Sequence, residues 1–313
     1  MFQVLRFTAN AFSLILLISC GRLSQPTVGA NQGQQNVMGD RGEGLDVLSY
    51  SLKGNFRWET NRLEAEVKIE FEQTKLNYLT LDSKVAWVKS VRSSNGALLP
   101  FALGQNDTLV IQFPNHKSGP LHETVVIDYE ALANSLPSGA DSGLSAIPAR
   151  TGDAVKSRVV YTKSEPNKAS DWMPCHNVPS DRARFSATFT MPGTENMISN
   201  GDRISDSWKG EARVVSYATK YTLPPYLMAF VVGEFQSSQE IHAGKTPVSV
   251  WSRRGLAGDF NGMARELAGF LVSYEKLLVP YPFEKYTLVL FPEFPSTGAE
   301  NAGITFQEEP SGT

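Results

Sequence analysis

A short segment near residue 300 combines residue types that could bind a charged ligand. Glu300 and Asn301 stand side by side between Gly298 and Gly303, in the stretch "TGAENAGITF". Glycine allows the backbone to approach a ligand closely or to adopt a positive φ. A carboxylate beside exposed backbone groups could therefore bind a cation or an amine. On spacing alone, the simpler interpretation is a glycine-containing loop in which the Glu and Asn side chains are solvated.

The histidines do not have the spacing of a metal site. The segment from His122 to Val126 begins like the zinc motif His-Glu-x-x-His, but its fifth residue is Val. That motif also needs a helix, on which its first and fifth residues share a face, whereas this segment is rich in β-branched residues. We therefore expect His122 to be a strand-end residue and the chain as written to hold no metal ligands. The other histidines, which no spacing combines into three protein ligands, are His116, His176 and His242.

A nucleophilic site is not indicated either. The chain has no Gly-x-Ser-x-Gly motif, and its most suggestive thiol, Cys175, is followed directly by His176. An imidazole can activate a neighbouring thiol, but adjacent residues of an extended chain point to opposite sides. The sequence therefore predicts that Cys175 is a buried packing residue.

The first twenty residues resemble a bacterial lipoprotein signal peptide. Arg6 supplies a thin positive region, and the apolar run 11–18 is too short to span a bilayer comfortably. The run ends in Leu-Ile-Ser-Cys20, which resembles a lipobox, in which the Cys is lipidated. In such lipoproteins Gly21, rather than Asp, favours the outer membrane. A simple secretory signal with a chance Cys is the alternative.

This N-terminus predicts an exported protein that is lipid-anchored in the bacterial cell envelope, at the outer membrane or in the periplasm. Residues 21–44 are rich in glycine and poor in large apolar side chains, so we expect a flexible tether. If Cys20 carries lipid, Cys175 is the remaining thiol and no internal disulfide can form.

The overall composition is that of an ordinary globular protein. Hydrophobic residues make up 41% of the chain and charged residues 19%, enough to build a sizeable core. The formal net charge is −3, which gives no reason to expect nucleic acid as a partner. A length of 313 residues allows two domains.

Period-two patterns dominate from about residue 50. In "RLEAEVKIEF", residues 62–71, apolar side chains alternate with charged ones, which predicts a half-buried strand. Many short strands separated by turn signals predict an antiparallel sandwich or curved sheet pair over residues 45–245. Further runs of this kind lie at 108–113, 123–129, 184–191 and 214–221, and the turn signals are Asn95-Gly96, Asn106-Asp107, Pro192-Gly193 and Asn200-Gly201.

The pattern becomes helical after residue 250. Apolar residues from Phe260 to Leu278 recur at helical spacing, and Pro280 ends the run. Strands are expected at 286–291 and 304–308. A helix and two or three strands cannot bury their own apolar faces, so residues 246–313 are expected to be the incomplete start of an α/β or α+β domain. We accordingly expect the chain to be a fragment or a truncation.

Three ordered motifs resemble the M1 family of zinc aminopeptidases, especially its leukotriene A4 hydrolase and aminopeptidase B branch. "FPSTGAENAGITF" resembles the family's Gly-x-Met-Glu-Asn segment, and "TLPPYLMAFVVGEF" resembles its Pro-x-Tyr-Leu-x-Ala-Phe-x-x-Gly stretch. "EPNKASDWMPCHNVPSDRARFSATFTMP" resembles its Glu-Pro-x-x-Ala-Arg-x-x-Phe-Pro-Cys segment.

The resemblance implies a mainly β fold: an antiparallel β saddle or sandwich followed by the truncated start of an α+β, thermolysin-like catalytic domain. It also implies peptide substrates with a free N-terminus, whose α-amine Glu300 and Glu165 would bind. Gly298 and Ala299 would lie along the substrate backbone, and Asn301 matches the family's Asn. A complete family member would use zinc, whose bound water attacks the peptide carbonyl, but the zinc motif of the family lies beyond the segment at Glu300.

The motifs depart from the family pattern at several positions. Ala299 replaces the usual Met, Ser170 stands where Arg is common, and Asn177 and Val178 replace an acidic pair. These departures suggest a divergent branch and leave its substrate preference open. An alternative function is a non-catalytic, membrane-anchored module that binds peptides or proteins through the same two glutamates.

Overall fold

The computed structural model describes most of the chain after the expected tether. The signal peptide, the lipidation site Cys20 and the tether up to residue 43 lie outside the described residues, so these assignments stay predictions. Thr297 also lies outside them. The structure describes residues 44–74, 77–114, 116, 119–135, 142–149, 157–296 and 298–310.

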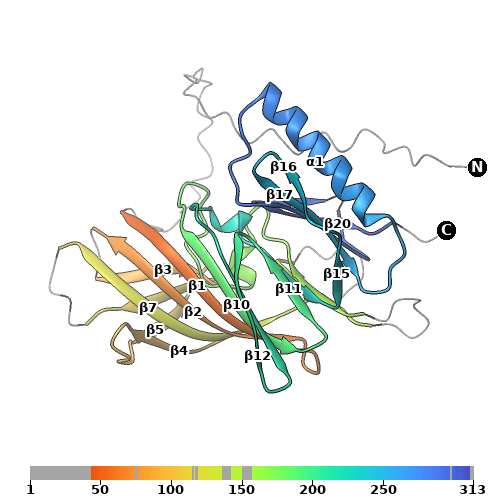
Figure 1. Cartoon of the computed structure of the whole chain (residues 1–313). Coiled ribbons are helices and arrows are strands. Elements are labelled where there is room, and N and C mark those ends of the chain that lie inside the picture. Colours follow the sequence, from red (N-terminus) through yellow and green to blue (C-terminus); the bar gives the residue numbers. More distant parts are fainter. Residues whose placement is uncertain are drawn as a thin grey trace, which may run out of the picture. The chain divides into compact units, whose positions relative to one another are not determined.

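A seven-stranded sheet with the strand order β12-β13-β10-β1-β2-β7-β4 is the largest element (Figure 1). Strand β2 contains the predicted alternation: its apolar side chains Leu63, Val67 and Ile69 are buried, whereas Lys68 is exposed. The strands are β1 (Leu45–Arg57), β2 (Arg62–Gln73), β4 (Trp87–Ser93), β7 (Leu121–Leu132), β10 (Arg184–Pro192), β12 (Asp202–Lys209) and β13 (Ala212–Ala218).

All neighbouring strands of this sheet are antiparallel except one pair. Strands β1 and β10 run parallel, whereas the other pairings are antiparallel as predicted. A parallel pair needs a long crossover connection, and the chain between β1 and β10 supplies one. The strand expected at 214–221 ends at Ala218, because the Thr219 hydroxyl accepts the Phe185 N–H and the chain then bends away.

Two smaller sheets complete the N-terminal part. In the three-stranded sheet β3-β6-β5, Asn106 and Asp107 adopt φ values of 58° and 56°, as expected for a tight turn of residues that tolerate this region. The four-stranded sheet has the order β11-β14-β9-β8. These strands are β3 (Tyr78–Asp82), β5 (Phe101–Gly104), β6 (Thr108–Gln112), β8 (Leu144–Ile147), β9 (Val159–Thr162), β11 (Asn196–Ser199) and β14 (Phe230–Gly233). Two 3-10 turns are η2 (Ala169–Asp171) and η3 (Pro225–Leu227).

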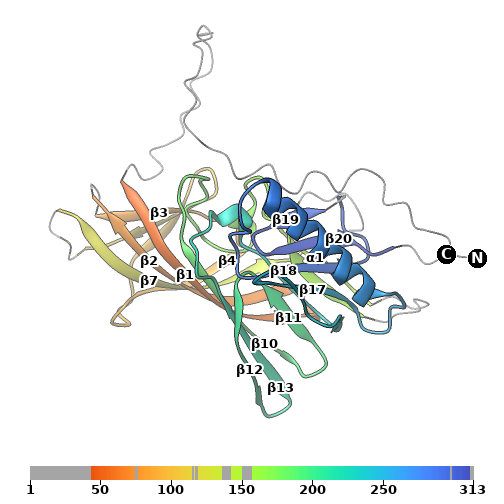
Figure 2. The ribbon, with the colours of Figure 1, turned by 45° about the horizontal axis from the view of Figure 1, so that its top comes forward.

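A six-stranded mixed sheet and one helix form the C-terminal part. Strands β17, β18 and β20 are parallel to one another, and helix α1 (Phe260–Leu277) is the crossover between β17 and β18. The helix packs on β16 and β17 (Figure 1), and Figure 2 shows α1 beside β17 from a second direction. Its N-cap is Asp259, whose side chain accepts the Gly262 N–H. The strands are β15 (Phe235–Ser237), β16 (Ile241–Ala243), β17 (Thr246–Arg253), β18 (Tyr286–Phe291), β19 (Ala299–Asn301) and β20 (Ile304–Glu308).

One buried apolar cluster joins the four-stranded sheet to the six-stranded sheet. Tyr161 of β9 and Val231 of β14 belong to the same cluster as Phe291 of β18 and Phe306 of β20. The Tyr161 and Phe291 rings lie 4.8 Å apart between centroids, within the range of favourable aromatic contacts. This core therefore fixes the two sheets against each other.

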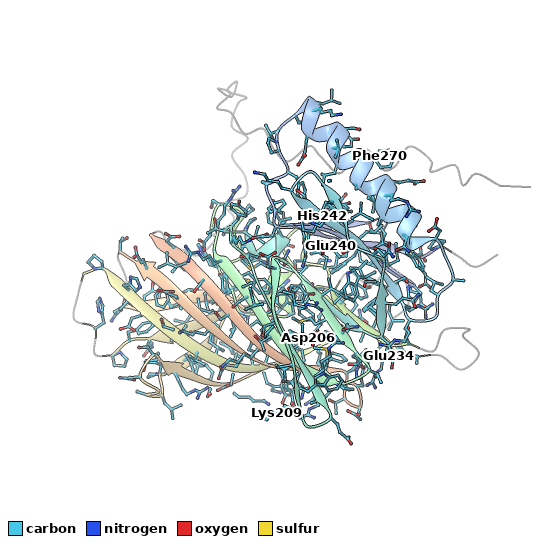
Figure 3. All side chains as sticks on the ribbon, in the orientation of Figure 1. Asp206, Lys209, Glu234, Glu240, His242 and Phe270 are labelled. Atoms are coloured by element: carbon cyan, nitrogen blue, oxygen red, sulfur yellow. The ribbon has the colours of Figure 1, made fainter. Side chains whose placement is uncertain are left out.

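The outer surface of α1 carries apolar side chains. Phe270, labelled on the helix in Figure 3, is 59% exposed. Among the described residues, no helix is both long and apolar enough to cross a membrane. The proposed domain boundary after residue 245 stays a prediction, although β15 and β16 from before it pair with β17.

Alanine substitutions at two glycines, one in the large sheet and one in helix α1, test the side-chain packing. A Cβ at Gly54 would lie 2.7 Å from the buried Phe189 ring, whereas at Gly269 of α1 it would meet nothing within 4 Å. We expect Gly54→Ala to lower the free energy of unfolding by about 1–3 kcal/mol through overpacking. Gly269→Ala should raise it by about 0.5–1 kcal/mol, because alanine favours the helix. Urea unfolding of both variants measures these effects, and equal stability of the two would contradict this packing.

Candidate functional site

Glu300 and Asn301 lie in an edge strand and not in a loop. Residues 299–301 form β19, which pairs with β20 through Glu300 opposite Thr305. The simpler interpretation of the sequence, a solvated loop, is therefore wrong. Gly303 lies in the turn between the strands and has a φ of 74°, which glycine adopts without strain. The buried strand expected after this segment is present as β20.

The two faces of β19 have different surroundings. Ala299 is 4% exposed and belongs to the apolar cluster that contains Phe291 and Phe306. Because side chains alternate along a strand, Glu300 lies on the opposite face, where it is partly exposed. Asn301 is on the buried face, and its Nδ2 has no hydrogen-bond partner among the described residues. Glu300 is thus the side chain of β19 that can meet a ligand.

Glu165 comes from a different part of the fold. It follows β9 and is partly exposed, and a cis peptide bond joins it to Pro166. Its neighbour Ser164 is buried and fixed: the Ser164 hydroxyl donates to Met228 O at 3.0 Å and accepts from Trp172 Nε1 at 3.1 Å. The backbone that carries Glu165 is therefore held by the core.

The charge of Glu300 acts on Glu165. Burial raises the pKa of Glu165 above its ordinary value, the Glu300 carboxylate raises it further, and Lys163 opposes the shift. Glu300 also raises the pKa of Tyr286, after the larger effect of burial. A neighbouring like charge disfavours the ionised form of a carboxyl group. A positively charged ligand would relieve this repulsion.

Two residues near Glu300, Tyr286 and Thr305, could not be identified from the sequence. Tyr286 opens β18, and its hydroxyl accepts a hydrogen bond from Thr305 Oγ1 at 3.4 Å. Thr305 is the cross-strand partner of Glu300. No local pattern indicates this arrangement, because it depends on the pairing of three strands.

The residues excluded as catalytic groups lie as predicted. His122 is the second residue of β7, is exposed, and contacts Glu72 through Nδ1 at 3.1 Å. Cys175 is fully buried, and burial raises the pKa of its thiol well above the ordinary value. His176 contacts Asp181 at 2.7 Å through Nδ1. Both predictions, a strand-end His and a packing Cys, are confirmed.

The described residues do not fit a zinc site. Within this part of the chain, no three His, Cys, Asp or Glu side chains gather in a way that could hold a metal ion. Zinc coordination by protein needs at least three such ligands. Independently of a metal, the carboxylates of Glu165 and Glu300 are groups that can bind a cation.

The comparisons with known proteins identify the family. Residues 45–227 match the Peptidase M1 N-terminal domain, which covers more than half of the chain. The chain therefore belongs to the M1 peptidase family, and the mainly β fold expected from the sequence is confirmed by its solved relatives.

The named relatives are aminopeptidases that are much longer than this chain. Aminopeptidase M1-A of Oryza sativa subsp. japonica is 26% identical over 207 residues, which cover 65% of this chain and 23% of that protein. Aminopeptidase N of Canis lupus familiaris is 22% identical, over 83% of this chain and 27% of that protein. The chain thus spans about a quarter of the curated relatives it matches.

Solved structures share the fold at low identity. A mutant of an M1 zinc metallopeptidase from Deinococcus radiodurans has a TM-score of 0.70 at 20% identity, over 85% of this chain and 61% of that chain. Yeast LTA4 hydrolase has a TM-score of 0.71 at 18% identity, over 85% and 41%. Another structure of the Deinococcus enzyme contains a Tyr-Ser-Ala substrate.

Proposed function

We propose that this chain provides the part of an M1-type aminopeptidase that recognises the free N-terminus of peptide substrates. Glu165 and Glu300 bind the α-ammonium group between them. The observation that carries the proposal is that Glu165, which follows β9, and Glu300, which lies in β19, come from separate parts of the fold, yet the charge of Glu300 raises the pKa of Glu165.

The chemistry of a peptide N-terminus suits this pair. An α-amine has a pKa near 8, so it is mostly protonated at neutral pH. An ammonium between two carboxylates adds two attractions, which offset the repulsion between them. Because only the first residue of a peptide carries this group, the two glutamates would define where the peptide begins. Such positioning would limit cleavage to the first peptide bond.

The edge of β19 suits an extended peptide. This strand pairs with β20 along one edge, and no described strand pairs with the other. An edge strand offers backbone N–H and C=O groups to a peptide in the manner of an added strand. Gly298 and Ala299 would contribute such groups next to Glu300. The Asn301 side chain is buried on the other face of β19, so its contribution is limited to the backbone.

Hydrolysis is a proposal for the whole protein. The relatives that carry the name aminopeptidase are about four times the matched length, and the family neighbours are called zinc metallopeptidases. Amine binding by the two glutamates needs no metal, so the function proposed for the described residues is substrate recognition. A non-catalytic peptide-binding module would use the same pair and would bind peptides without cleaving them.

The proposal predicts selective binding of a free amine. The full chain should bind Tyr-Ser-Ala at least about tenfold more tightly than N-acetyl-Tyr-Ser-Ala, which corresponds to about 1.4 kcal/mol. Glu165→Gln and Glu300→Gln should each weaken binding of the free peptide by a similar factor, because each removes one attraction to the ammonium group. Isothermal titration calorimetry or saturation-transfer NMR measures these affinities.

The matched control is Glu123→Gln. Glu123 is a partly exposed glutamate in β7 of the large sheet, and its substitution should leave the affinity unchanged. Equal binding of the free and acetylated peptides would overturn the proposal. So would a wild-type affinity in both site variants.

Binding should depend on pH in a bell-shaped manner. The pKa of Glu165 is raised, so at low pH this carboxyl is protonated and attracts the ammonium weakly. Affinity for Tyr-Ser-Ala should rise as pH increases through that pKa and fall above about pH 8, where the α-amine loses its proton. A profile without a rising limb, measured by titrations between about pH 4 and pH 9, would contradict this assignment.

A further inference from the structure

Asn200 has a role that its sequence context does not indicate. The pair Asn200-Gly201 predicts a turn, and the structure places a bend after β11. The Asn200 side chain, however, is 1% exposed. Asparagine is rarely buried unless its amide is hydrogen-bonded. Its partners therefore show what this residue does.

The Asn200 side-chain amide makes hydrogen bonds to three backbone groups from two separate segments. Its Nδ2 donates to Ala302 O at 2.8 Å and to Leu227 O at 2.9 Å. Its Oδ1 accepts the Ala229 N–H at 2.6 Å. Both amide hydrogens are thus used, and the oxygen has a partner. The side chain ties the turn between β19 and β20 to the segment between η3 and β14.

These two segments carry the two glutamates. Ala302 is two residues after Glu300 and closes the β19–β20 hairpin. On the other side, Met228 stands between Leu227 and Ala229, and its carbonyl accepts the hydroxyl of Ser164, the neighbour of Glu165. A short path of buried hydrogen bonds, from Ser164 through residues 228–229 and Asn200 to the hairpin, therefore connects the two carboxylates.

We propose that Asn200 is a positioning residue that sets the separation between Glu165 and Glu300. This inference rests on the proposed function for its consequence in peptide binding. The two carboxylates repel each other, so a hairpin without this tie would move away from Glu165. Because Coulomb energy falls with distance, the movement would weaken both the repulsion and the shared attraction for an ammonium group.

A neighbouring contact acts on a different strand. Lys285, which precedes β18, donates from Nζ to Ser199 O at 2.8 Å and lies over the Tyr217 ring at 4.2 Å. This contact holds the start of β18, whose Thr287 N–H donates to Gly303 O of the hairpin turn at 3.1 Å. Lys163 lowers the pKa of Glu165 against the effect of burial, and the charge of Glu300 raises the pKa of Tyr286 in addition to burial. Among the described hydrogen bonds, neither Lys163 nor Tyr286 contacts Asn200.

The test compares Asn200→Ala with Ser199→Ala. Ser199 is fully buried, and its hydroxyl donates to Ala229 O at 2.7 Å. Both variants lose buried hydrogen bonds to the same residue, but only Asn200→Ala loses the bond to the hairpin. The readouts are the Glu165 carboxyl titration, followed by carbon-13 NMR on the full chain, and the affinity for Tyr-Ser-Ala.

Asn200→Ala should lower the pKa of Glu165 towards its ordinary value and weaken Tyr-Ser-Ala binding by about fivefold or more. Ser199→Ala should leave both readouts unchanged, whatever its effect on stability. A folded Asn200→Ala with a wild-type Glu165 titration would overturn the inference. The same shift in both variants would also overturn it, because a general loosening of the core would then suffice.

Two further outcomes keep the inference separate from the proposed function. If the wild-type chain shows no preference for the free peptide, the proposed function fails, whereas the Glu165 titration without peptide still reports on Asn200. If Asn200→Ala does not fold, the inference is tested in the wild-type chain instead, by the NMR resonances of the Asn200 side-chain amide. Saturating Tyr-Ser-Ala should shift them, because relief of the repulsion changes the pull on the hairpin; unchanged resonances would overturn the inference.

Discussion

The repulsion between Glu165 and Glu300 is the interaction on which the proposed site depends. Burial and the neighbouring carboxylate together raise the pKa of Glu165, and Lys163 offsets this only in part. An arrangement that brings like charges together works against the stability of the fold. Groups whose pKa values are shifted by burial and a nearby charge are more common at binding and catalytic sites than elsewhere on a protein surface.

The architecture holds this unfavourable pair in place. Glu165 follows a strand of the four-stranded sheet, and Glu300 lies in the edge strand of the six-stranded sheet. A shared aromatic core, in which Tyr161 packs against Phe291, fixes the two sheets against each other. Asn200 adds a hydrogen-bonded tie at the hairpin itself. Packing thus sets the coarse geometry, and one buried amide sets the finer spacing.

Elements with a strong local period could be predicted, whereas pairings between distant segments could not. The alternating pattern of β2 and the helical spacing of α1 predicted the ends of these two elements to within two residues. The motif at Glu300 drew attention to residues 298–303, but their strand conformation depends on pairing with β20 and could not be predicted locally. The parallel pairing of β1 with β10 joins residues more than a hundred positions apart. Asn200 resembled an ordinary turn residue because its partners lie in other segments.

The most direct test of the central claim is the carboxyl titration of Glu165 in the wild-type chain and in Glu300→Gln, followed by carbon-13 NMR without any peptide. If the two carboxylates interact as described, Glu165 titrates above the ordinary range in the wild-type chain. It then titrates at a lower pH once the charge at position 300 is removed. An identical titration curve in the two proteins would show that the two groups do not interact, and the account of a shared amine site would be wrong.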